Sequence, residues 1–64
     1  MKGWIEVTVW AEGRTTNSLV SISIAAISQV GSMGDHGMIE RIDAGKLETA
    51  ENYSALLAKI KDAS

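Results

Sequence analysis

The sequence predicts an α+β domain, in which a small antiparallel β-sheet of three to five short strands packs one C-terminal amphipathic helix on one face. Two segments within the first 24 residues alternate apolar and polar side chains with a period of two, which is typical of half-buried strands. One segment near the C-terminus instead spaces its apolar residues as a helix does. At 64 residues, with no internal repeat and no linker, we expect a single domain over residues 1–64.

The first predicted strand covers Trp4 to Trp10 and carries large apolar side chains on both faces. One face holds three β-branched residues: Ile5, Val7 and Val9. The other face holds both tryptophans of the chain and a threonine: Trp4, Thr8 and Trp10. A single helix covers only one face, so the second apolar face is expected to form an interface. If the tryptophans cover the helix instead, the β-branched face becomes the interface.

The middle of the chain predicts two further strands separated by turns. Gly13 favours a hairpin turn after the first strand, and the next alternating segment runs from Ser18 to Ile24. A tight turn at residues 25–26 then leads into a strand from Ile27 to Val30.

Three glycines, at positions 31, 34 and 37, interrupt the chain after Val30, and we expect a mobile connection there. A strand from Met38 to Asp43, a turn over residues 43–46 and a short strand from Lys46 to Glu48 complete the predicted sheet.

The last segment predicts the helix. Thr49 is the expected N-cap, and Glu51 would place a negative charge in the first turn, where it suits the helix dipole. The apolar stripe has i, i+3, i+4 and i+7 spacing: Tyr53, Leu56, Leu57 and Ile60.

Composition excludes several classes of function. Eight acidic residues against six basic ones give a net charge of −2, which does not favour binding to nucleic acid. The chain has no cysteine, and no segment approaches the roughly 20 apolar residues of a membrane span. We therefore expect a cytoplasmic protein, in a bacterium or a phage-infected cell. Because so short a chain buries little surface alone, oligomerisation is the expected additional source of stability.

Three segments taken together resemble the small FlbD-like proteins, which include phage-borne relatives: WIEVT at 4–8, VSISIAAI at 20–27, and MIERI at 38–42 with LETAENY at 47–53. The sequence departs from that pattern at Ser23, where the family has Asn, at Ala25 and Ala26, and in its longer glycine-rich insert. The resemblance implies a strand-rich fold and a non-catalytic role in motility, or an unassigned role in a phage. No functional residue is carried over, because folding alone explains the matched positions.

Candidate chemical sites are few. His36 beside Asp35, with Glu40 four residues on, suggests a divalent metal site, but a glycine-flanked loop supplies too few rigid ligands. His36 as a general base would also need a positioned nucleophile and an oxyanion site. We therefore predict no catalytic residue, no metal and no cofactor.

Two binding hypotheses remain. The leading one is a small non-enzymatic interaction protein that forms a homo-oligomer through the tryptophan-bearing face. The alternative is a phage-encoded anti-defence protein that sequesters a small anionic signal such as a nucleotide, or blocks a host protein. In that case the glycine-rich loop and a mid-strand arginine would bind the anion, through Ser32, Gly34, His36 and Arg41.

Overall fold

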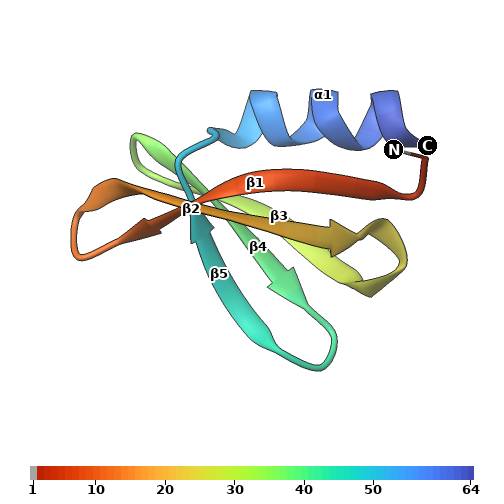
Figure 1. Cartoon of the computed structure of the whole chain (residues 1–64), viewed down its shortest axis with the longest axis horizontal. Coiled ribbons are helices and arrows are strands. Elements are labelled where there is room, and N and C mark those ends of the chain that lie inside the picture. The colour runs from red at the N-terminus through yellow and green to blue at the C-terminus, as the bar shows by residue number, and fades with distance from the viewer. Residues whose placement is uncertain (1) are drawn as a thin grey trace.

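The computed structural model describes residues 2–64 and confirms the predicted fold class, with a five-stranded antiparallel sheet and one C-terminal helix (Figure 1). The elements in chain order are β1 (Trp4–Ala11), β2 (Arg14–Ser23), the 3-10 turn η1 (Ile24–Ala26), β3 (Ile27–Met33), β4 (His36–Arg41), β5 (Gly45–Thr49) and α1 (Tyr53–Ala63). The strand order is β2-β1-β5-β4-β3.

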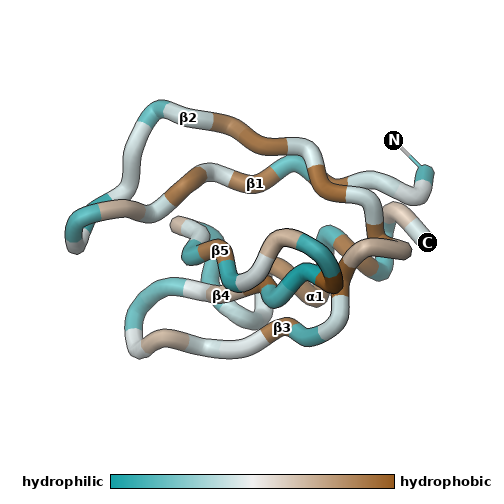
Figure 2. The backbone as a smooth tube through the Cα atoms, turned by 90° about the horizontal axis from the view of Figure 1, so that it is seen from below, coloured by the Kyte–Doolittle hydropathy of each residue, from teal (hydrophilic) through white to brown (hydrophobic). Residues whose placement is uncertain are grey.

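The sheet consists of two parts that meet along a short seam. β1 and β2 form one hairpin, and β3, β4 and β5 form a meander. At the seam Val9 pairs with Thr49, and the Ala50 amide donates to the Thr8 carbonyl at 2.9 Å. β2 and β3 are the two opposite edges of the sheet, yet only the three residues of η1 connect them. The sheet therefore curls so that its two edges come close together (Figure 2).

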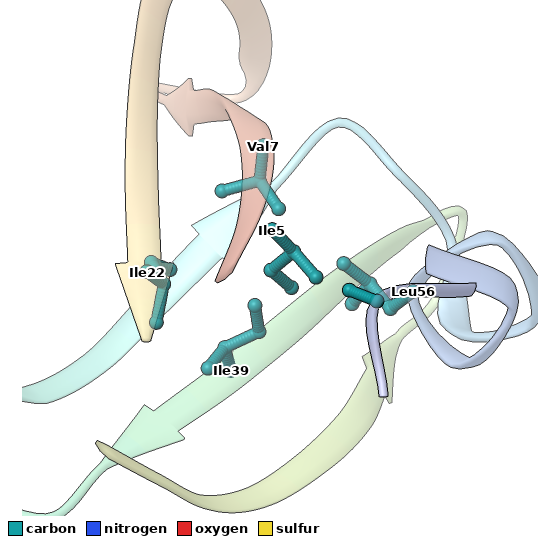
Figure 3. Packing of buried hydrophobic residues seen from close by; sticks show 6 residues of the cluster. Ile5, Val7, Ile22, Ile39 and Leu56 are labelled. Carbon is teal, nitrogen blue, oxygen red and sulfur yellow. The ribbon is translucent and has the colours of Figure 1, made fainter. Parts of the chain in front are cut away.

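The core lies between the curled sheet and α1. Its buried members come from both parts of the sheet and from the helix: Ile5, Val7, Ile22, Ile39, Leu56 and Ala63. Figure 3 shows side chains from β1, β2, β4 and α1 pointing into one common space. The prediction that Ile5 and Val7 face the helix is confirmed. Val9 is only half-buried, because it lies at the seam.

β2 is longer than predicted because it contains a bulge. Thr8 pairs with Leu19 and Trp10 pairs with Thr15, so three residues of β2 lie opposite Val9 alone. The Thr16 hydroxyl donates to the Val9 carbonyl at 2.8 Å and satisfies a group that the bulge would otherwise leave unpaired. The strand therefore begins at Arg14 rather than Ser18.

The prediction of a mobile connection over residues 31–37 is wrong, because β3 and β4 extend through it to a two-residue turn at Gly34 and Asp35. Gly34 has φ of 79°, as the first position of a type II′ hairpin turn requires. Gly37 has no room for a side chain: a Cβ there would overlap the Glu51 carbonyl oxygen and lie 2.7 Å from Leu56 Cδ1. β4 accordingly spans His36–Arg41 rather than residues 38–43.

The predicted N-cap is also wrong. Thr49 ends β5, is fully buried, and donates its hydroxyl to the Glu51 carbonyl at 2.8 Å. Asn52 is the N-cap, and its side chain accepts from the Ala55 amide at 2.9 Å. Of the predicted helical stripe, Leu56 is fully buried, whereas Tyr53 and Leu57 are exposed.

Candidate functional site

The sheet face that α1 does not cover carries most of the side chains that could bind a ligand or take part in a reaction. Thr49 pairs with both Val9 and Gly37, so these three residues share one row on the inner face. Because side chains alternate along a strand, the residues next to them lie on the outer face. The outer face therefore holds residues from four strands: Thr8 and Trp10 of β1, Met33 of β3, His36 and Met38 of β4, and Glu48 of β5.

Trp10 and His36 form the centre of this face. Their rings stack with centroids 4.2 Å apart and planes within 8° of parallel. The His36 side chain is largely buried, and its Nε2 lies 2.6 Å from Glu48 Oε1 while its Nδ1 lies 3.3 Å from Asp35 Oδ1. One ring thus links β1, β4, β5 and the β3–β4 turn.

The hydrogen bond to Glu48 raises the pKa of His36 above its ordinary value of 6.5. Burial of the ring opposes this rise, and the Asp35 carboxylate adds to it. Charged His36 can donate from both ring nitrogens to the two carboxylates, which favours the protonated form.

Sequence reasoning associated His36 with Asp35 and Glu40 but missed Glu48. Glu48 is twelve residues away and becomes a neighbour only through the pairing of β4 with β5, in which it lies opposite Met38. The spacing along the chain contains no signal for this contact. Only the strand register could have indicated it.

The predicted interface residues do not form one continuous patch. Trp4 is 46% exposed and lies at the opposite end of β1 from Trp10, roughly 20 Å away at the rise of an extended strand. Trp10 is half-buried, and His36 covers one of its ring faces. Thr8 is half-buried as well, and its amide donates to both Glu51 carboxylate oxygens at 2.9 and 3.1 Å.

Trp4 lies between two open concavities. One, of about 610 Å³, is lined by Trp4, Ile5, Glu6 and Ser21 on the β1–β2 hairpin. The other, of about 210 Å³, lies between the start of β1 and the end of α1, where Lys59 and Asp62 line it. The indole therefore borders both concavities.

The predicted anion-binding residues are divided between the two ends of β4. Ser32, Gly34 and His36 lie around the β3–β4 turn. Arg41 lies at the far end of the strand, where its guanidinium donates to the carbonyls of Ala44 at 3.1 Å and Gly45 at 3.3 Å. The structure does not bring Arg41 together with the other three.

A scan against protein-family models, a search of the curated proteins and a search of the solved structures each find no match to this chain. The resemblance to FlbD-like proteins therefore stays a prediction. Among residues 2–64, no helix is long and apolar enough to cross a membrane. The same residues contain no cluster of three or more histidine, aspartate or glutamate side chains that could coordinate a metal ion.

Proposed function

We propose that this protein is a small non-enzymatic interaction module that self-associates through the outer sheet face around Trp4. The observation that carries the proposal is the exposure of the Trp4 indole between two concavities. Tryptophan is enriched in the cores of protein interfaces, where it combines a large apolar area with little loss of conformational entropy.

The size of the chain supports self-association. A domain of about 60 residues buries only about 60% of its unfolded surface, so a second interface adds substantially to its stability. β2 also supports it, because this edge strand presents Leu19, 60% exposed, opposite Thr8 on the same face as Trp4. A second copy that covers Trp4 and Leu19 would remove both from water.

Size-exclusion chromatography with light scattering tests the proposal. The wild-type chain should run above its monomer mass of 6.8 kDa at micromolar concentration, and Trp4→Ala should shift it toward the monomer. Leu57→Ala is the matched control, because Leu57 is exposed to a similar extent but lies on α1, away from the outer sheet face. A wild-type monomer at these concentrations would refute the proposal, as would equal effects of the two substitutions.

The alternative, sequestration of a small anionic signal, has less support from the site. Asp35 lies at the tip of the β3–β4 turn, and together with Glu48 it offsets the positive charge that His36 could offer an anion. Arg41 is already engaged with turn carbonyls. A thermal-shift screen against nucleotides tests this function: a ligand at 100 times its Kd should add about 2.7 kcal/mol to the stability.

A further inference from the structure

Soft ligand atoms are concentrated on the outer face beside the β3–β4 turn. The chain has one histidine and three methionines, and the histidine and two of the methionines lie here. Met33 pairs directly with His36 across the two strands, and Met38 follows His36 by two residues on the same face of β4. The end of the Met38 side chain lies over Gly31 of β3, because a Cβ added at Gly31 would be 3.1 Å from Met38 Cε. Met38 therefore extends from β4 across β3, the strand that also carries Met33.

The contacts of His36 determine which nitrogen is free to bind a ligand. Nε2 faces Glu48 on β5, and its 2.6 Å contact is a short hydrogen bond in which Nε2–H donates to the carboxylate. Nδ1 faces Asp35 in the β3–β4 turn, and the strand register places Met33 of β3 directly opposite His36. In the neutral ring, with its one proton on Nε2, the Nδ1 lone pair and the Asp35 carboxylate 3.3 Å away are two acceptors that face each other. Such a pair favours a cation between or beside them.

The chemistry of the surrounding atoms selects the kind of cation. Thioether sulfur is a soft ligand that suits Cu(I), whereas hard divalent ions prefer carboxylate and carbonyl oxygen. Glu48 bonds to the far nitrogen of the ring and cannot share an ion with Nδ1. Its hydrogen bond instead resembles the outer-sphere carboxylate that commonly orients a metal-binding histidine.

We propose that Nδ1 of His36 and the sulfur atoms of Met33 and Met38 form a site for one soft monovalent cation, Cu(I) or its analogue Ag(I). The Trp10 indole stacks on the imidazole with the ring centroids 4.2 Å apart, so an ion bound to His36 would lie close to a fluorescent ring. This differs from the sequence prediction of no metal, which considered only His36 with carboxylates. The inference does not depend on self-association through Trp4.

The test uses Ag(I), which needs no reductant, in chloride-free buffer. Trp4→Phe leaves Trp10 as the sole tryptophan, and titration with silver nitrate should quench its fluorescence to an endpoint of one ion per chain. Native mass spectrometry of the wild-type chain should show the same stoichiometry. Met33→Leu and Met38→Leu should each weaken binding by at least ~10-fold, and Glu48→Gln by ~10–100-fold.

Glu40→Gln is the matched control, because Glu40 lies on the same face of β4 but beyond Met38, and it should leave the Ag(I) affinity unchanged. Thermal unfolding of each variant checks its fold; Met33 is exposed, and Leu is close to Met38 in volume. Absence of a one-to-one complex would overturn the proposal. Loss of affinity from only one of the two methionine variants, or tighter binding of Zn(II) than of Ag(I), would overturn it as well.

Discussion

Gly37→Ala tests how the chain enters α1. A Cβ at this position would overlap the Glu51 carbonyl oxygen and would lie 2.7 Å from Leu56 Cδ1 and 3.0 Å from Thr49 Oγ1. The Glu51 oxygen belongs to the backbone and already accepts the Thr49 hydroxyl at 2.8 Å, so it cannot move aside without breaking that bond. Leu56 is fully buried in the core and cannot move aside freely either.

The magnitude follows from these contacts. Overpacking a core typically lowers the free energy of unfolding by about 1–3 kcal/mol. Because neither the Glu51 carbonyl nor Leu56 can move aside freely, we expect Gly37→Ala to cost about 2–3 kcal/mol. A chain of 64 residues has a stability of roughly 3–10 kcal/mol at the usual value per residue. For a domain of this size, the substitution should lower Tm by about 10–20 °C.

Urea denaturation monitored by circular dichroism, with a thermal melt, measures the effect. Gly31→Ala is the matched control, because its Cβ would meet only the flexible end of Met38, at 3.1 Å. It should lie within about 1 kcal/mol of wild type. Equal unfolding midpoints for Gly37→Ala and wild type would refute the close packing of residue 51 over β4, and the segment would then behave as the mobile connection that its glycines suggest.

Three further perturbations test other contacts. Because the pKa of His36 is raised in the folded state, its ion pair with Glu48 stabilises the fold fully below pH 6.5, and this contribution is lost as the pH rises through the folded pKa. The urea midpoint should therefore be lower at pH 8.5 than at pH 6, and His36→Gln and Glu48→Gln should each reduce that difference. Asn52→Ala removes the N-cap acceptor and should cost about 1 kcal/mol in a urea titration. Leu56→Ala should cost about 2–5 kcal/mol in the same assay, whereas Leu57→Ala should stay within about 1 kcal/mol of wild type.

Each of these predictions has an outcome that contradicts it. A midpoint that rises from pH 6 to pH 8.5 would reverse the sign of the His36 argument. Asn17→Ala, in the exposed bulge of β2, makes the same substitution without a cap, and an equal loss of stability there would contradict the capping role of Asn52. If Leu57→Ala cost as much as Leu56→Ala, the helix would bury the wider stripe that its sequence suggests.

Much of the fold was predictable because local chemistry specifies it. The alternation from Trp4 to Trp10 correctly placed Ile5 and Val7 in the core. The spacing of apolar residues near the C-terminus correctly predicted a helix, although not its first residue. Gly13 correctly marked the β1–β2 turn, where its φ of 79° is accessible to glycine at little cost.

The candidate site was less predictable because its contacts join distant residues. His36 and Trp10 were singled out separately, but nothing in their spacing indicates that their rings stack. The partner of His36 was expected among its neighbours in sequence, whereas the structure supplies Glu48 from the next strand of the sheet. Met33 was assigned to a mobile connection, where no register with His36 could be considered.

The sequence by itself therefore determined the kinds of element and their order along the chain, since residue period and turn propensity are local properties. It favoured burial of Ile5 and Val7 but left the opposite face of β1 as an alternative. Only the tertiary structure decided what the three glycines do. Gly34 forms a turn, Gly37 admits the Glu51 carbonyl and the Leu56 side chain, and Gly31 leaves space for Met38. A flexible loop and a closely packed hairpin have the same local composition, and they differ only in which distant atoms occupy the space that a missing Cβ leaves.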